Sequence, residues 1–169
     1  MSLRPTTMDR STFVATFGGV FEHSPWIAEA AWDAGLPGDA DTADGLHRCL
    51  CAALAPATPD RKLALLQAHP DLAGKLARAG RLTAESTHEQ ASAGLDQLTD
   101  EERATFTALN DTYTSRFGFP FIIAVKGRSK AEILGEFHSR IANGRDQELA
   151  AALAQIERIA LLRLKDLLP

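Results

Sequence analysis

One histidine of the chain occupies a position from which an imidazole could transfer protons. His69 precedes Pro70, whose ring disfavours helical geometry for the residue before it. The sequence therefore predicts that His69 lies at a joint between one helix over 60–68 and another over 71–79. A joint of this kind can point a side chain into a cleft, and imidazole titrates near neutral pH, which suits general acid–base catalysis. The alternative is an ordinary surface or core histidine.

Three polar residues form a second candidate group. Ser86, Glu89 and Gln90 are three and four positions apart, so a helix over 84–95 would place a hydroxyl, a carboxylate and an amide on one face. Such a row could bind a polar ligand. The alternative is a solvated helix face, which is the common situation for polar rows.

An arginine interrupts an apolar stripe near the end of the chain. Arg163 lies within a predicted helix over 146–168, and the other members of its stripe are Leu149, Leu153, Ile156, Ala160 and Leu167. A buried guanidinium keeps its proton and therefore needs an anion. That anion could be a carboxylate of the protein or a ligand, and a side chain that snorkels to the helix edge is a third possibility.

The helical pattern stops near residue 120. Gly118 and Pro120 precede a β-prone run that consists of Phe121, Ile122, Ile123, Ala124 and Val125. No partner strand is visible, so the backbone N–H and C=O groups of this run need partners from elsewhere. A flat, urea-like ligand could supply them, and so could water or a helix end.

Helix-start signals occur along most of the remaining chain. Ser24 and Thr58 each precede a proline, which predicts a capped helix start at both places. Thr83 can cap the helix of the polar row. Thr99 and Ser129 are each followed by a glutamate three residues later, as in a capping box.

These signals predict about eight helices. With 169 residues and 45% hydrophobic content, the chain is long enough for one well-filled core. We therefore expect an all-α bundle, a single domain over residues 1–169, with one short extended segment near 119–125. An all-helical interaction module would show the same amphipathic helices, so the fold class alone does not assign a function.

Composition argues against several classes of protein and of site. The net charge of −4 offers no basic surface for nucleic acid, and no apolar run approaches the length of a membrane span, so we expect a cytoplasmic protein. Cys49 and Cys51 match neither a disulfide framework nor a zinc motif, and we expect reduced, buried thiols. The five histidines show no metal-ligand spacing, so no metal site is expected.

Five strings of residues together resemble the OHCU decarboxylase family, where OHCU is 2-oxo-4-hydroxy-4-carboxy-5-ureidoimidazoline. They are GGVFEHSPW at 18–26, AHPDL at 68–72, STHEQ at 86–90, FGFPFI at 117–122 and LRL at 162–164. The match is collinear from about residue 13 to residue 168. Each string is weak evidence by itself, and the resemblance depends on their joint occurrence.

The resemblance implies an all-helical enzyme, usually a homodimer, that converts OHCU to (S)-allantoin and CO₂ without a cofactor. It gives the catalytic roles to His69 and Glu89. The substrate-contacting positions that it implies are Pro70, Ser86, Gln90, the backbone of 121–125, and Arg163.

This chemistry is consistent with the residue types. The C=N unit of the substrate can accept the electron pair that CO₂ loss leaves behind, so no external electron sink is needed. We interpret His69 as the acid–base group, and Glu89 as either its orienting partner or an acceptor for ureido N–H groups. Another cofactor-free lyase or hydrolase that acts on a ureido or imidazoline compound remains the alternative.

Overall fold

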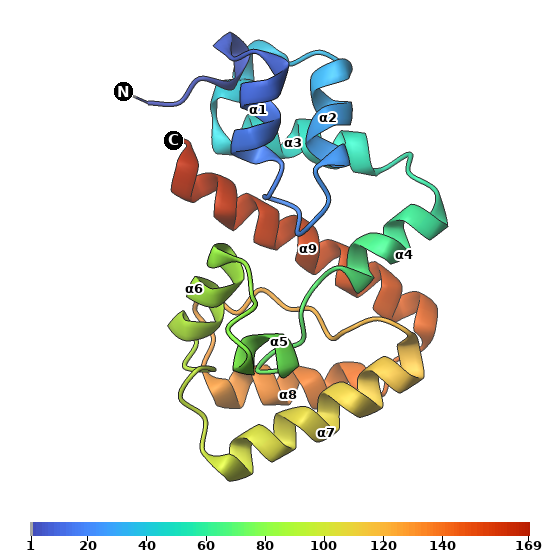
Figure 1. Cartoon of the computed structure of the whole chain (residues 1–169). Helices are drawn as coiled ribbons and strands as arrows, with labels where there is room; N and C mark the ends of the chain where they lie inside the picture. The colour runs from blue at the N-terminus through green and yellow to red at the C-terminus, as the bar shows by residue number, and fades with distance from the viewer. Residues whose placement is uncertain (1) are drawn as a thin grey trace. The chain divides into compact units, whose positions relative to one another are not determined.

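The computed structural model describes residues 2–169, and helices make up most of that part of the chain (Figure 1). Nine α-helices, two short 3₁₀ helices and no β-strand occur in these residues. In chain order the elements are η1 (Pro5–Thr7), α1 (Arg10–Phe17), α2 (Trp26–Asp33), η2 (Gly38–Asp41), α3 (Ala43–Leu54), α4 (Pro59–Gln67), α5 (Lys75–Arg78), α6 (Ala84–Ser92), α7 (Asp100–Phe117), α8 (Lys130–Ile141) and α9 (Arg145–Leu167). The predicted all-α fold class is confirmed.

Most helices begin where the sequence predicts, because a hydroxyl satisfies a backbone N–H group of the first turn. The residues whose hydroxyls accept this bond, from the N–H three positions later, are Thr42, Thr58, Thr83, Thr99 and Ser129. Both predicted capping boxes are complete, with Glu102 bonded back to Thr99 and Glu132 bonded back to Ser129. Each cap stabilises its helix by about 1 kcal/mol.

The predicted cap at Ser24 is wrong. The Ser24 hydroxyl donates to the carbonyl of Glu22 at 3.0 Å, and α2 begins at Trp26 without a side-chain cap. Ser24 is buried, and the preceding residue, His23, has a φ of +50°. The hydroxyl therefore stabilises the connection between α1 and α2 instead of the helix start.

The predicted helix over 71–79 is also wrong for its first half, since only α5 is helical there. Ala73 has a φ of +52°, and Gly74 continues in an extended conformation. A left-handed conformation costs a residue with a Cβ atom about 1–2 kcal/mol. Contacts from outside the turn must therefore hold Ala73 in place.

The chain divides into two compact units, and the first consists of residues 2–68 and Ile156–Pro169. Helix α2 packs against both α1 and α3 in this unit (Figure 1). Phe13 and Phe17 have their ring centres 5.2 Å apart and are almost fully buried. The end of the chain is attached to the same unit, because the Ala43 N–H donates to the Pro169 carbonyl at 2.8 Å.

The second unit consists of His69–Gln155 and contains α5 to α8 and the first half of α9. An aromatic cluster fills its core, with Tyr113 in contact with the rings of Phe117, Phe119, Phe121 and Phe137. All five of these rings are at most 2% exposed. Whether the two units form the single domain expected from the sequence stays a prediction.

None of the helices within residues 2–169 combines the length and the apolarity needed to cross a membrane.

Candidate active site

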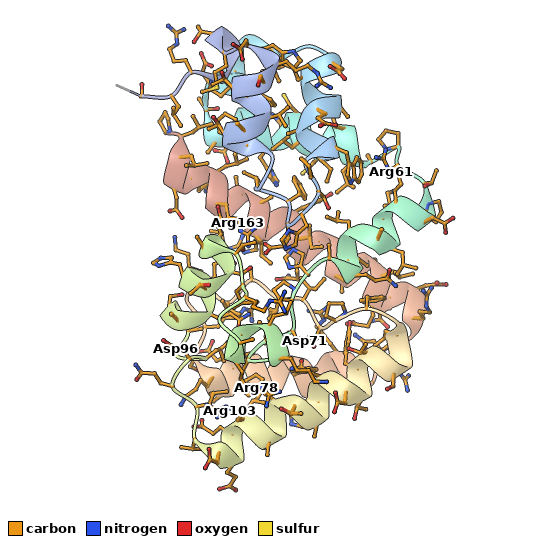
Figure 2. All side chains as sticks on the ribbon, viewed as in Figure 1. Arg61, Asp71, Arg78, Asp96, Arg103 and Arg163 are labelled. Carbon is orange, nitrogen blue, oxygen red and sulfur yellow. The ribbon has the colours of Figure 1, made fainter. Side chains whose placement is uncertain are left out.

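His69 lies in a turn that follows α4, as its position before Pro70 predicts. Residues 69–74, called the His69 turn below, contain no helix, and both His69 and Pro70 are partly buried. A Cβ atom on Gly74 would lie 2.6 Å from the Cβ atom of Asp71, so this position of the turn requires glycine. Figure 2 shows Asp71 in this turn, ahead of α5. The local sequence therefore ends one helix, presents His69 and begins a short second helix.

The row of polar residues lies on α6, whose first turn is capped by Thr83. Ser86 is 4% exposed and Gln90 is 6% exposed, and Glu89 between them is partly buried. The alternative of an ordinary solvated face is therefore wrong for Ser86 and Gln90. The solvated side of the helix carries Thr87 and His88 instead.

Hydrogen bonds join the His69 turn to α6. The Ala73 N–H donates to Gln90 Oε1 at 2.9 Å, and Gln90 Nε2 donates to the Asp71 carbonyl at 3.3 Å. A residue that the sequence analysis missed contacts the same turn from α7, because Asn110 Nδ2 donates to the Leu72 carbonyl at 2.9 Å. The turn that carries His69 is thus held by amide side chains from two helices.

The Asp71 carboxyl group lies in a desolvated environment. Burial raises the pKa of Asp71 above its ordinary value of 3.8, and the negative charge of Asp111 raises this pKa further. Both effects disfavour the carboxylate form. The turn therefore contains an acidic group whose ionisation is opposed by its surroundings.

A cavity of about 460 Å³ borders the same turn. Ala73 and Gln90 are in its wall, together with Arg78, Asp96 and Arg103, and Figure 2 labels these three charged residues. His69, Ser86 and Glu89 do not line it. Of the predicted site residues, only Gln90 therefore lines this cavity.

The segment 121–125 has neither helix nor strand geometry, and its five residues are at most 5% exposed. Side chains satisfy part of its backbone: Arg140 Nη1 donates to the Ile122 carbonyl, and the Ala124 N–H donates to Gln155 Oε1 at 2.9 Å. Within residues 2–169, the N–H groups of Ile122 and Ile123 have no protein acceptor. Buried donors without an acceptor are rare in proteins, which makes this segment a candidate ligand-binding surface.

A buried polar network supports this segment. Arg140 Nε donates to Glu148 Oε1 at 3.0 Å, and the guanidinium lies 4.5 Å from the centre of the Phe121 ring. Tyr113 and Asn143 also donate to the Glu148 carboxylate, which is fully buried. Burial, followed by the hydrogen bond to Glu148, raises the pKa of Tyr113, so the phenol stays protonated.

Arg163 is buried, as its stripe predicts, and it has an internal anion. Its Nη1 lies 2.8 Å from Glu22 Oε2 and also donates to the carbonyls of Gly19 and Val20, at 3.3 and 3.4 Å. A close approach shapes this loop, since a Cβ atom on Gly18 would lie 2.4 Å from the Val14 carbonyl oxygen. Among the possibilities from the sequence, the internal salt bridge is therefore present, and snorkelling is wrong for a residue only 5% exposed.

The predicted site residues fall into two sets. The unit of residues 69–155 contains His69, Pro70, Ser86, Glu89, Gln90 and the segment 121–125. Arg163 belongs to the other unit. The hydrogen bonds of Gln90 connect its row to the turn of His69, whereas segment 121–125 has polar contacts with α8, with α9 and with Arg128 before α8.

Sequence reasoning missed Asn110, Arg140 and Glu22. A signal for Asn110 was present, because it follows Phe106 by four positions and precedes Tyr113 by three, which makes it a polar residue on an apolar stripe. Arg140 follows Phe137 and Ile133 in the same way. Glu22 lies within one of the strings that carry the family resemblance.

The two cysteines are free thiols, as expected, but they are only partly buried, so the expectation of buried thiols is wrong. Burial raises the pKa of Cys51 to about 12, and burial also raises the pKa of Cys49. Neither thiol is therefore a nucleophile at neutral pH. In the part of the chain that the structure describes, no three His, Cys, Asp or Glu side chains are grouped as metal ligands.

Comparisons with known proteins agree with the resemblance. A family model described as OHCU decarboxylase matches residues 6–165. A 2-oxo-4-hydroxy-4-carboxy-5-ureidoimidazoline decarboxylase of Halalkalicoccus jeotgali is 41% identical over 159 residues, which are 94% of this chain and 86% of the relative. The protein of the same name from Haloferax volcanii is 38% identical over 94% of this chain and 90% of its own length.

A solved structure is similar over nearly the whole chain. The crystal structure of (S)-allantoin synthase has a TM-score of 0.78 and 31% identity, with 98% of this chain covered. This chain spans about half of that protein, 52% of its length. Because the family model and the two decarboxylases match almost all of the sequence, the chain belongs to the OHCU decarboxylase family.

Proposed function

We propose that this protein is a carboxy-lyase that removes CO₂ from OHCU and releases (S)-allantoin, without a metal or an organic cofactor. The observation that carries the proposal is the family match over residues 6–165, which includes every predicted site residue. The hydrogen bonds between the His69 turn and α6 support it, because they connect the two regions to which the resemblance gives the catalytic roles.

The substrate supplies the electron sink in this reaction. Loss of CO₂ leaves an electron pair on a ring carbon, and the adjacent C=N unit accepts that pair. The enzyme then has to orient the carboxylate out of the ring plane, exclude water and deliver a proton to one face of the enediol-like intermediate. No step in this sequence requires a group that the chain does not provide.

His69 is the proposed acid–base group, and Glu89 is either its orienting partner or an acceptor for the ureido N–H groups. An imidazole in a partly buried turn keeps access to the substrate and can exchange protons near neutral pH. Glu89 is partly buried on the same helix as Ser86 and Gln90. Its carboxylate is thus presented beside a hydroxyl and an amide.

The remaining proposed contacts bind the substrate and fix its orientation. They are Pro70, Ser86, Gln90, the backbone of Phe121, Ile122, Ile123, Ala124 and Val125, and Arg163. The N–H groups of Ile122 and Ile123 suit the carbonyl oxygens of a planar ureide. Arg163 suits an anionic or carbonyl oxygen, because its planar fork of donors gives directional hydrogen bonds.

The assembly and location that we propose are a homodimer in the cytoplasm. The family resemblance supports the homodimer. The composition, with its net charge of −4 and no apolar run of membrane-spanning length, supports the cytoplasmic location. Nucleic acid and membranes are not proposed as partners.

Turnover of freshly generated OHCU tests this function. Purified protein, treated exhaustively with a chelator, should release CO₂ from OHCU faster than the spontaneous reaction. His69→Asn keeps much of the side-chain shape and removes the proton donor, so it should lower the rate by about 10²–10⁴-fold with little change in stability. His138→Asn, an exposed histidine of α8, is the matched control and should keep the full rate.

The same measurements distinguish the proposed function from its main alternative. A protein that hydrolyses the preceding pathway intermediate, but leaves the rate of CO₂ release from OHCU unchanged, would have the other activity. A folded His69→Asn variant with wild-type turnover would exclude the catalytic role of His69.

A further inference from the structure

The middle of the His69 turn, residues 71–73, is not held by backbone hydrogen bonds, whereas the Gly74 carbonyl at its end accepts from the Arg78 N–H at 3.1 Å. In the described chain, no backbone N–H or C=O group of Asp71, Leu72 or Ala73 bonds to another backbone group. Three of these groups bond to side-chain amides instead: the Asp71 and Leu72 carbonyls accept, and the Ala73 N–H donates. The conformation of the turn is therefore set from outside it.

The two amides come from different helices and are both buried. Gln90 on α6 is 6% exposed, and Asn110 on α7 is 4% exposed. They hold a turn in which Ala73 has a positive φ, a conformation that residues with a Cβ atom rarely adopt unaided. Loss of either amide would allow the turn to relax toward an ordinary conformation.

The turn is connected to His69 through a short piece of chain. Leu72 is three residues from His69, and the ring of Pro70 between them fixes one of the backbone dihedrals. Movement of the Leu72 carbonyl can therefore displace the backbone of His69 and change the direction of the imidazole. Catalysis is sensitive to such changes, and a displacement of about 1 Å can lower a rate about 10²-fold.

We propose that Asn110 is a positioning residue for the decarboxylation. It holds the Leu72 carbonyl from α7, while Gln90 holds the other side of the turn from α6, and together they set the direction in which His69 meets the substrate. This inference rests on the proposed function, in which His69 is the acid–base group. It assigns no contact between Asn110 and the substrate.

The surroundings of Asn110 support a role beyond packing. Its neighbours along the stripe, Phe106, Tyr113 and Phe117, are almost fully buried, and an apolar residue would fill such a position without burying an amide. Asn110 Oδ1 is buried without a hydrogen-bond partner in the described chain. The amide thus buries an unsatisfied acceptor and makes a single hydrogen bond, the one to the turn.

Two substitutions of Asn110 and one control test the proposal. Asn110→Leu removes the hydrogen bond and keeps the same branching and number of side-chain heavy atoms. Asn110→Asp is nearly isosteric: a neutral carboxyl can donate to the Leu72 carbonyl, whereas a carboxylate repels it. Phe106→Leu, one turn earlier on α7, is the control, because it weakens the buried packing of the same helix and leaves the hydrogen bond of Asn110 to the turn in place.

The measured quantities are kcat and KM for OHCU at several pH values between 6 and 8.5, each divided by the wild-type value. Asn110→Leu should lower kcat at least tenfold and change KM less than threefold. Asn110→Asp should lower kcat most at high pH and recover as the pH falls. Burial and the negative charges of Asp71 and Asp111 favour the neutral form of the introduced carboxyl, and division by the wild type removes the titration of His69 itself.

Phe106→Leu should keep the wild-type kcat while the protein remains folded. Equal losses of kcat in Phe106→Leu and Asn110→Leu would overturn the proposal, since the effect would then be loss of stability. A wild-type kcat in Asn110→Leu, or an Asn110→Asp profile parallel to the wild type, would also overturn it. If Asn110→Leu does not fold, the pH profile of kcat in the near-isosteric Asn110→Asp variant tests the proposal by itself.

A second readout does not depend on OHCU. The ¹⁵N resonances of the His69 imidazole in the ligand-free protein should shift in both Asn110 variants and stay in place in Phe106→Leu. Unchanged His69 resonances in the Asn110 variants would overturn the positioning role, whatever the activity. An inactive wild-type enzyme together with shifted His69 resonances would instead contradict only the proposed function.

Discussion

Each of the two units contains one buried arginine–glutamate pair that holds a non-helical segment. In the first, Arg163 pairs with Glu22 at 2.8 Å and donates to carbonyls of the loop between α1 and α2. In the second, Arg140 pairs with Glu148 at 3.0 Å and donates to the Ile122 carbonyl. Both arginines lie on apolar helix stripes and are less than 10% exposed.

The two arginines differ in the role that the family resemblance implies. Glu148 also accepts from Tyr113 and Asn143, so the Arg140 pair is one part of a larger internal network. The family resemblance, in contrast, gives a substrate-binding role to Arg163 and none to Arg140. Burial on an apolar stripe therefore predicts that an arginine has an anion, but does not tell a structural arginine from a ligand-binding one.

Disruption of the Glu148 network should have the largest effect on stability. Glu148→Gln removes the negative charge that balances Arg140. It also replaces the carboxylate oxygen that accepts from the Asn143 amide with an N–H₂ group, which donates. Loss of one partner of a buried pair costs about 3–5 kcal/mol of unfolding free energy. Urea unfolding monitored by circular dichroism measures it, and a loss below 1 kcal/mol would mean that the network does not stabilise the second unit.

The same substitution at both arginines should separate the two roles. Arg163→Lys keeps the charge opposite Glu22 and loses the planar fork, so KM for OHCU should rise about tenfold, which corresponds to about 1.4 kcal/mol. Arg140→Lys should lower the free energy of unfolding more than Arg163→Lys does and change KM less. Steady-state kinetics and urea unfolding of both variants check this. A larger rise of KM in Arg140→Lys than in Arg163→Lys would contradict the substrate-binding role of Arg163.

A third carboxyl, that of the partly buried Asp71, should give the smallest effect on stability. Burial and the negative charge of Asp111 raise the pKa of this group, and no cation is among the causes of the shift. The folded protein then binds the proton more tightly than the unfolded chain, so the group favours folding at low pH and this contribution is lost as the pH rises through the raised pKa. Asp71→Asn should therefore raise the urea midpoint at pH 7.

The stabilisation in Asp71→Asn should shrink as the pH falls toward the ordinary aspartate value of 3.8. Asp9→Asn is the comparison with the opposite sign, because backbone hydrogen bonding lowers the pKa of this exposed helix cap. A midpoint difference for Asp71→Asn that is constant between pH 4 and 7 would contradict the account of Asp71.

Local signals predicted the helices well. Caps such as Thr58 and the capping box of Thr99 with Glu102 are confirmed, since their hydrogen bonds join residues only three positions apart. The same signal was wrong at Ser24, whose hydroxyl bonds to Glu22 in the loop before it. Side-chain hydrogen bonds compete with one another, and a cap motif does not reveal the alternative partner.

The missed features depend on contacts between distant residues. The turn at 71–74 replaces a predicted helix because Gln90 and Asn110, 19 and 38 positions from the carbonyls that they bond, satisfy its backbone. Glu22 and Arg163 are more than 140 positions apart. Neither periodicity nor propensity reports on such pairs, whereas the predicted burial of Arg163 needed only the pattern of its own helix.

The central claim, that this chain decarboxylates OHCU with control over one face of the substrate, is tested most directly by circular dichroism of the product during turnover. Uncatalysed breakdown of OHCU gives racemic allantoin, whereas a pocket that fixes the ring before proton delivery gives one enantiomer. The account predicts the (S)-allantoin signal, growing in step with CO₂ release, from the wild-type protein alone. A racemic product, or a signal no faster than the spontaneous reaction, would contradict it.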